Sequence, residues 1–320
     1  MKKRRLGRTD IEITPIGLGC WQFSQGKGFA AGFWKNLGAE AIRSIVETAL
    51  RGGVNWFDTA EAYGNGTSEQ KLAEALEALD VEPGAVVVAT KWQPFFRTAG
   101  SISSTIDRRT ECLAPYRIDL YQVHNPMSFS SIPAQMQEMA TLLKAGRIRS
   151  VGVSNFSAAQ MQAAHDALAA QGIALASNQV RFNLLDRSIE KNRVLEAAKR
   201  LGVTIIAWSP LAQGILTGRF HEEPQSMREI PGLRRMMGRL GRGTLERTRP
   251  LVDELRAIAR AHGAAVSQVA LSWEVSFHGE TIVAIPGASR PAQADQAAAA
   301  ADLVLSPREM SRIDELSRPR

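Results

Sequence analysis

The strongest constraint on the fold is a regular alternation of short apolar segments with longer amphipathic segments along the 320-residue chain. The short segments are apolar throughout, without an alternation of apolar and polar residues, which is typical of strands buried on both faces of a parallel sheet. Eight segments fit this description. The predicted strands are residues 15–20, 54–58, 85–91, 118–124, 148–153, 175–179, 203–209 and 281–286.

Helical patterns follow these strands, and several have recognisable ends. Ser68 and Ser157 are predicted N-caps, and the glycines predicted to follow helix ends are Gly52, Gly146, Gly202 and Gly263. The predicted helices are residues 40–52, 68–79, 102–114, 133–146, 158–170, 188–201, 244–262 with 266–277, and 291–301. Eight strands alternating with eight crossovers predict an α/β protein that forms a closed (β/α)8 TIM barrel, with an open doubly wound sheet as the alternative.

Three segments fall outside the repeat. Residues 5–14 predict an N-terminal β-hairpin that closes the bottom of the barrel. Residues 213–243 form a long irregular segment, and loops of this length are often functional lids. Residues 306–316 predict an extra C-terminal helix. Because barrels of this size commonly form one domain, we expect residues 1–320 to be a single domain.

Composition excludes several classes of protein. No apolar stretch approaches the ~18 residues of a membrane helix, and the basic N-terminus lacks the apolar run of a signal peptide, so we expect a cytoplasmic protein without a membrane partner. Cys20 and Cys112 are too few for a disulfide framework and have no metal-ligand spacing, so no metal is expected. In the cytoplasm the Asn65-Gly66-Thr67 glycosylation pattern is a chance match.

The excess positive charge behind the net charge of +7 is concentrated in two segments. Residues 227–249 contain seven arginines and two glutamates, residues 2–5 add four cations, and the remaining chain is slightly acidic. Because no aromatic residues are interleaved, we expect no nucleic-acid partner. The arginine-rich region is either a surface loop with a charge bias or a lid that faces an anion. Its arginines are Arg228, Arg234, Arg235, Arg239, Arg242, Arg247 and Arg249.

Reactive residues lie at the predicted carboxyl ends of three strands, where barrels carry their active sites. Asp58 and Lys91 end two strands, Tyr63 follows Asp58 in the next loop, and His124 is the only one of five histidines that ends an apolar strand. Each residue also has a structural interpretation: a turn cap for Asp58, core packing for Tyr63, a solvated cation for Lys91 and a buried imidazole for His124.

Together these four side chains could form an acid–base site for the reduction of a carbonyl group. A phenol with a pKa near 10 is a poor acid at neutral pH unless a nearby cation favours its ionised form. Lys91 would supply that cation, Asp58 would hold Lys91, and His124 would orient a substrate carbonyl toward Tyr63 as the general acid. Such a site adds hydride to a carbonyl carbon, and the hydride must come from a cofactor.

The motifs resemble those of the aldo-keto reductases over nearly the whole chain. They are Asp58-Thr59-Ala60, Tyr63-Gly64, Ser68-Glu69, Lys91, Gln122-Val123-His124, Gly152-Val153-Ser154-Asn155-Phe156, Trp208-Ser209-Pro210-Leu211 and Ile285-Pro286-Gly287-Ala288. The resemblance implies a barrel without a Rossmann domain, so Gly64-x-Gly66 is not a phosphate loop. It implies NADPH-dependent reduction of an aldehyde or ketone by Asp58, Tyr63, Lys91 and His124. A regulatory or redox-sensing NADPH-binding protein, like the potassium-channel β subunits, is the alternative.

The resemblance also assigns cofactor contacts. Ser154, Asn155, Gln179 and Trp208 match the nicotinamide site. The remaining positions that match cofactor contacts are Trp21, Asp58, Ser209, Pro210, Leu211, Gln213, Gly214, Leu216, Gly287, Ser289, Arg290, Gln293 and Gln296. Arg290 suits bidentate phosphate binding and favours NADPH, with NADH possible. The chain departs from many relatives at Gln296 and Ala297, where acidic and asparagine residues are common.

An aromatic wall is expected for the substrate, which favours a hydrophobic or ring-bearing carbonyl compound. Its predicted members are Trp21, Phe23, Phe33, Trp34, Trp92, Phe95 and Phe129. We further expect the arginine-rich residues 227–249 to fold over the bound dinucleotide. The oligomeric state is not predicted.

Overall fold

An eight-stranded parallel sheet forms the centre of the computed structural model, which describes residues 1–27, 32–238 and 240–318. Each neighbouring pair of strands is parallel, and bridges from Ile16 to Ala284 and from Gly19 to Gly287 join the first strand to the last. This confirms the predicted (β/α)8 barrel. The strands are β3 (Leu18–Gly19), β4 (Trp56–Asp58), β5 (Val87–Trp92), β6 (Ile118–Val123), β7 (Ile148–Ser154), β8 (Leu175–Arg181), β9 (Thr204–Trp208) and β10 (Ile282–Ala284).

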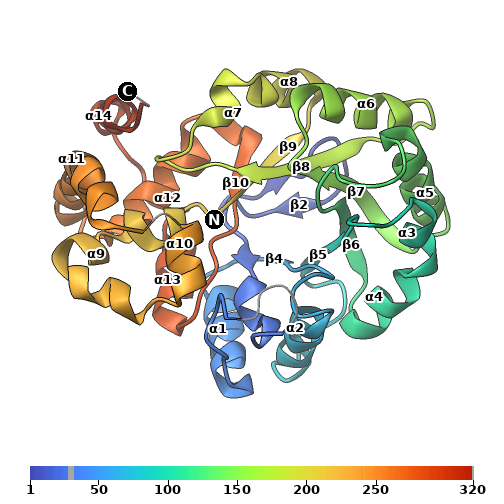
Figure 1. The fold of residues 1–320 in the computed structure, drawn as a ribbon, viewed down its shortest axis with the longest axis horizontal. Helices are drawn as coiled ribbons and strands as arrows, with labels where there is room; N and C mark the ends of the chain where they lie inside the picture. Colours follow the sequence, from blue (N-terminus) through green and yellow to red (C-terminus); the bar gives the residue numbers. More distant parts are fainter. Residues whose placement is uncertain (28–31, 239, 319–320) are drawn as a thin grey trace.

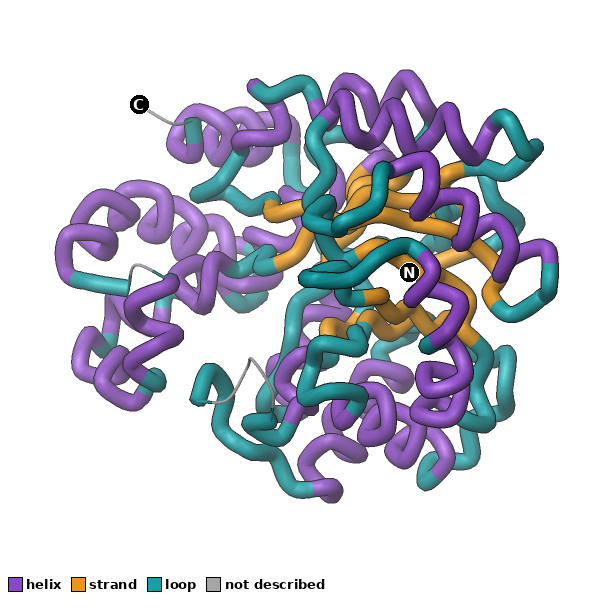
Figure 2. The backbone as a smooth tube through the Cα atoms, turned by 45° about the vertical axis from the view of Figure 1, so that its right-hand side comes forward, coloured by secondary structure: helices purple, strands orange, loops and turns teal. Residues whose placement is uncertain are grey.

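Helices surround the strands, as Figures 1 and 2 show. Two predicted helices are each divided in two: Thr105 separates α3 from α4, and Arg193 adopts a left-handed φ of 68° between α7 and α8. The helices of the repeat and the C-terminal helix are α1 (Ala39–Arg51), α2 (Thr67–Glu77), α3 (Gly100–Ser104), α4 (Ile106–Leu113), α5 (Ile132–Lys144), α6 (Ala158–Ala169), α7 (Ser188–Lys191), α8 (Val194–Leu201), α11 (Arg242–Ala261), α12 (Val266–Ser276), α13 (Pro291–Ala299) and α14 (Pro307–Ser317).

The predicted helix ends are partly confirmed. Ser157 and Ser306 each form a capping box. Ser68 is not an N-cap, because α2 already begins at Thr67 and the Ser68 hydroxyl donates to the carbonyl of Cys20, 2.6 Å away. Gly146, Gly202 and Gly263 adopt the expected left-handed conformation, whereas after α1 it is Gly53 and not Gly52 that does so.

The N-terminal hairpin closes the amino end of the barrel, as predicted. β1 (Arg4–Arg5) pairs antiparallel with β2 (Glu12–Ile13). Leu6, Ile11 and Ile13 are buried, and they pack in one apolar cluster with side chains from inside the barrel. The strand members of this cluster are Trp56, Ala89, Leu120, Ala176, Ile206 and Val283. The larger core lies between the sheet and the helices.

The segment 213–243 is not irregular, contrary to the prediction. It folds into short helices on one side of the barrel, drawn in yellow and orange in Figure 1. These are η3 (Ala212–Thr217), α9 (Arg219–Glu222), η4 (Pro224–Glu229) and α10 (Gly232–Met237), and α11 begins at Arg242. Arg239 lies outside the described residues. The other short helices are η1 (Trp21–Ser24) and η5 (Gly279–Thr281).

Across the described ranges, no helix combines the length and apolar character needed to span a membrane.

Candidate active site

A pocket of about 1070 Å³ opens at the carboxyl ends of the strands. Its wall includes Asp58 at the end of β4, His124 after β6, Gln179 in β8 and Trp208 at the end of β9. Side chains from distant parts of the sequence meet here because all parallel strands end at the same mouth of the barrel. This volume lies slightly above the usual range of about 300 to 1,000 Å³ for small-molecule sites.

Asp58 and Lys91 form a buried ion pair behind the pocket wall, with side-chain exposures of 1% and 0%. Lys91 Nζ donates to Asp58 Oδ1 and, at 2.8 Å, to the carbonyl of Thr59. Asp58 Oδ2 accepts from the amide nitrogens of Gln179 at 2.8 Å and Gln122 at 3.1 Å. Both carboxylate oxygens are therefore satisfied, and the solvated interpretation of Lys91 is wrong.

Tyr63 lies at the pocket surface above this ion pair. Lys91 Nζ is 5.1 Å from the centroid of the Tyr63 ring, and the His124 ring approaches it edge-on at 5.8 Å. Burial raises the pKa of Tyr63, while the Lys91 cation acts in the opposite direction. The net shift therefore differs from the lowering expected from the sequence, because burial outweighs the cation.

Lys91 and His124 differ in charge at neutral pH: Lys91 is a cation, and His124 is neutral. Burial by itself would lower the pKa of Lys91, but Asp58 and Tyr63 more than offset it, so this pKa is raised. Burial and the Lys91 cation lower the pKa of His124 to about 3. His124 is therefore a neutral imidazole at physiological pH, able to donate one ring N–H to a ligand.

The predicted nicotinamide residues share one side of the pocket. Asn155, at a left-handed φ of 61°, accepts from Trp208 Nε1 at 3.1 Å and donates to the carbonyl of His124 at 3.1 Å. Ser154 Oγ donates to the carbonyl of Gln179 at 2.9 Å. These bonds fix the Trp208 indole at the end of β9 and the Asn155 amide after β7, with β8 between the two strands.

The arginine-rich region reaches the same pocket through Arg234. Its guanidinium lies over Trp34, 3.9 Å from the ring centroid, and donates at 3.2 Å to the side-chain and backbone oxygens of Gln213. Burial lowers the pKa of Arg234 to about 10. One arginine of residues 227–249 thus joins two loops across the pocket.

The far end of the pocket contains Ser289, Arg290, Gln293 and Gln296. Gln293 accepts from the backbone N–H of Ser289 at 2.8 Å. Arg290 is exposed beside the N-terminus of α13. Its guanidinium forms no ion pair with a carboxylate in the described part of the chain, which leaves it available to an anionic group.

Most predicted site residues line the pocket, but five do not; one of them is Lys91, which lies behind the pocket wall. Phe23, Trp92 and Leu216 are buried in the core and do not reach the pocket surface, because their apolar side chains pack between the sheet and the surrounding elements. Phe129 is 72% exposed and points outside the pocket. Trp21, Phe33, Trp34 and Phe95 do line it, together with every other predicted cofactor residue.

Several polar lining residues were not predicted from the sequence. The Gln22 amide packs against Gly287, where an added Cβ would lie 2.3 Å from Gln22 Oε1. This oxygen is buried and has no hydrogen-bond partner among the described residues. Gln93 and Asn125 line the wall beside His124. Gln122, which bonds Asp58 behind the wall, had a sequence signal, because it begins the Gln122-Val123-His124 motif.

No group of three His, Cys, Asp or Glu side chains that could bind a metal occurs within residues 1–27, 32–238 and 240–318.

The closed barrel and the pocket at its strand ends define the class of this protein, an α/β-barrel enzyme. The model of the Aldo/keto reductase family matches residues 15–318. An uncharacterized oxidoreductase of Mycobacterium tuberculosis is 38% identical over 96% of this chain and 90% of that protein. The chloroplastic pyridoxal reductase of Arabidopsis thaliana is 31% identical over 87% of this chain and 76% of its own length.

A solved structure extends these comparisons. The crystal structure of an aldo-keto reductase from Klebsiella pneumoniae in complex with NADPH has a TM-score of 0.74 and 25% identity, over 100% of this chain and 97% of that one. The chain belongs to the aldo/keto reductase family, and it is an NAD(P)H-dependent oxidoreductase.

Proposed function

We propose that this protein reduces an aldehyde or ketone to an alcohol with NADPH, and that Tyr63 is the general acid. The observation that carries this proposal is the position of Tyr63 at the pocket surface, with the Lys91 cation 5.1 Å from its ring centroid and the neutral His124 beside it. A proton donor, a cation and a neutral hydrogen-bond donor around one small volume suit the addition of hydride to a carbonyl group.

The pocket fits a nicotinamide dinucleotide. Asn155, Gln179 and Trp208 line it, the Asn155 amide bonds the Trp208 indole, and Gln22 Oε1 offers a buried acceptor with no partner in the described chain. Arg290 would bind a phosphate at the other end of the pocket, which favours NADPH over NADH. When bound there, the cofactor supplies the hydride. The complex of the Klebsiella pneumoniae reductase with NADPH supports this assignment.

The residues of the chain have distinct roles in this proposal. His124 donates an N–H to the substrate carbonyl oxygen and orients it toward Tyr63. As negative charge develops on that oxygen, the Tyr63 hydroxyl gives it a proton, and the Lys91 cation stabilises the resulting tyrosinate. Asp58 keeps Lys91 charged and fixes its position. Burial keeps Tyr63 protonated before the reaction, because it raises the pKa of the phenol.

We also propose that residues 1–320 form one domain. One continuous apolar cluster extends from Ile16 to Ile313 and includes residues of the sheet and of the surrounding helices. A single core of this kind is the usual mark of one domain.

The substitution Tyr63→Phe tests the proposed acid. We expect kcat for a panel of aldehydes and ketones to fall by about 10² to 10⁴, while the Kd of NADPH, measured by fluorescence titration, stays near the wild-type value. The matched control is Tyr116→Phe, since Tyr116 donates to the carbonyl of Val81 outside the pocket. Wild-type turnover with NADPH and with NADH measures the cofactor preference.

Full activity of Tyr63→Phe would refute the role of Tyr63. Tight NADPH binding by the wild type with negligible turnover of every carbonyl compound would instead favour a regulatory or redox-sensing protein.

A further inference from the structure

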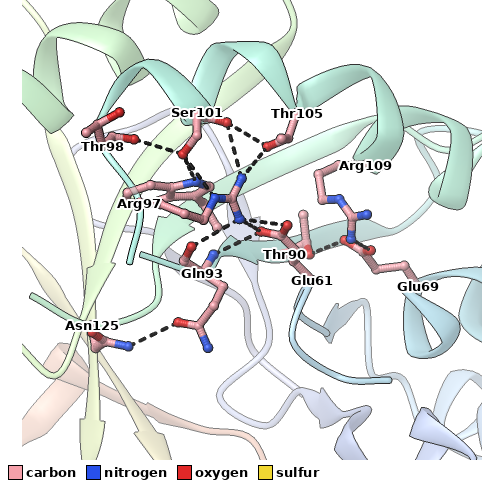
Figure 3. A network of polar contacts seen from close by, with 11 residues as sticks. Glu61, Glu69, Thr90, Gln93, Arg97, Thr98, Ser101, Thr105, Arg109 and Asn125 are labelled. Carbon is pink, nitrogen blue, oxygen red and sulfur yellow. Dashed lines mark hydrogen bonds and ion pairs between the residues drawn. The ribbon is translucent and has the colours of Figure 1, made fainter. Parts of the chain in front are cut away.

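Two amide side chains in the pocket wall, Gln93 and Asn125, are oriented by a chain of hydrogen bonds. Asn125 Oδ1 accepts from the backbone N–H of Met127 at 2.9 Å, so its Nδ2 must face the other way. Nδ2 donates to Gln93 Oε1 at 3.2 Å. Gln93 Nε2 is therefore left as a donor, and among the described residues no acceptor binds it. In Figure 3 this nitrogen points away from the surrounding polar contacts.

The backbone of Gln93 is held from both sides. Its N–H donates to Glu61 Oε2 at 3.0 Å, and its carbonyl accepts from Arg97 Nη1 at 3.1 Å. Arg97 Nη1 also bonds both oxygens of Glu61, at 2.8 and 2.9 Å, and its other nitrogens bond Ser101 and Thr105. Figure 3 shows these contacts converging on Arg97. Because Glu61 precedes Tyr63 by two residues, this network fixes Gln93 relative to the proposed acid.

The amide pair lines the same pocket as a group of aromatic rings. Trp21 stacks on Phe33 at a centroid distance of 4.6 Å and on Tyr63 at 5.7 Å. Asn125 directly follows His124 in the chain, and both residues line the pocket. Most residues assigned to the cofactor lie at the ends of β7, β8 and β9 or near α13, and neither Gln93 nor Asn125 is among them, so we assign these two residues to the substrate. A substrate in this pocket can therefore contact both aromatic rings and a free amide donor.

We propose that Gln93, oriented by Asn125, is a specificity-determining residue that donates a hydrogen bond to a polar substituent of the substrate. The substrate class is then a ring-bearing aldehyde that also carries a hydrogen-bond acceptor such as a hydroxyl group. This assignment rests on the proposed carbonyl reduction. Gln93 is half-buried and lines the pocket, and its Nε2 takes no part in the network that holds its backbone, so this nitrogen is open to a bound substrate.

The experiment compares benzaldehyde with its 2-, 3- and 4-hydroxy derivatives in the wild type and in Gln93→Leu, a variant of similar volume without hydrogen-bonding atoms. We expect the wild type to favour at least one hydroxylated isomer in kcat/KM. Gln93→Leu should reduce that preference by about 2- to 12-fold, the range of one neutral hydrogen bond, mainly through KM, and leave benzaldehyde within about twofold. Asn125→Ala should reduce the preference partially, because Gln93 can then rotate.

The matched control is Gln137→Leu, on the exposed surface of α5 away from the pocket. It should leave kcat/KM unchanged for benzaldehyde and for each hydroxylated derivative. An unchanged preference in Gln93→Leu, or an equal loss for benzaldehyde and all its derivatives, would overturn the subsite. So would a wild type that reduces benzaldehyde as well as every hydroxylated isomer. Wild-type turnover of benzaldehyde with NADPH tests the carbonyl reduction separately, so a failure of the subsite is distinguishable from a failure of the reaction.

Discussion

Lys91 and Asp58 form an ion pair inside the barrel, where neither side chain exposes more than 1% of its surface. Two glutamine amides, from Gln122 and Gln179, bind the second carboxylate oxygen. The pair therefore combines a structural function with the proposed catalytic one, because it fixes a cation beneath Tyr63 at a position that water does not reach.

We expect Asp58→Asn to lower the free energy of unfolding by about 3 to 5 kcal/mol, because the substitution leaves the buried Lys91 without its counter-charge. Urea unfolding of the wild type and the variant measures this change. The control is Asp107→Asn, which removes the partner of Arg147 on the surface and should change stability by less than about 1 kcal/mol. Equal stability of Asp58→Asn and this control would mean that Lys91 does not need its counter-charge.

Arg234→Met tests whether the arginine-rich region closes over the cofactor. Methionine keeps an unbranched side chain against Trp34 but removes the charge and the two hydrogen bonds to Gln213. We expect the Kd of NADPH to rise about tenfold, as for the loss of one charge-assisted hydrogen bond, and to depend less on salt. The control is Arg235→Met, at the exposed neighbouring position in α10. Identical affinities and salt dependences in both variants would exclude a cofactor contact by Arg234.

The buried Glu274 in α12 should make the free energy of unfolding depend on pH. Its carboxyl group is fully buried, neither oxygen has a partner within the described residues, and burial raises its pKa well above the usual 4.5. Between pH 4.5 and the raised pKa, the folded protein retains a proton that the unfolded chain releases, so the free energy of unfolding falls as pH rises. Between pH 5 and pH 8, Glu274 should contribute up to about 4 kcal/mol to the decrease in the free energy of unfolding, at about 1.4 kcal/mol per pH unit. The variant Glu274→Gln should lack this contribution.

Unfolding free energies of the wild type and Glu274→Gln at several pH values between 5 and 8 provide the measurement. Glu77→Gln, at an exposed position of α2, is the control and should leave the pH dependence unchanged. Parallel pH profiles for the wild type and Glu274→Gln would show that Glu274 does not titrate as proposed.

Local signals in the sequence predicted most of the architecture because strand and helix patterns repeat eight times. The same signals were wrong where a tertiary contact decided the outcome. Ser68 has the chemistry of an N-cap, but its hydroxyl bonds Cys20, 48 residues away, and the helix begins earlier. Trp92 has the chemistry of a pocket wall, but its indole donates to Ser101 beneath the surface.

The sequence by itself determined the barrel and the hairpin beneath it, and it singled out Asp58, Tyr63, Lys91 and His124 as the proposed catalytic residues, because strand ends and motifs are local in the chain. Only the tertiary structure decided how these groups affect one another. Burial outweighs the Lys91 cation at Tyr63 and makes His124 neutral. It also decided that Gln93 presents a free amide donor to the pocket, since the bonds that orient it come from Asn125 in the loop after β6. Burial and hydrogen-bond direction depend on neighbours brought together by folding, and no local pattern encodes them.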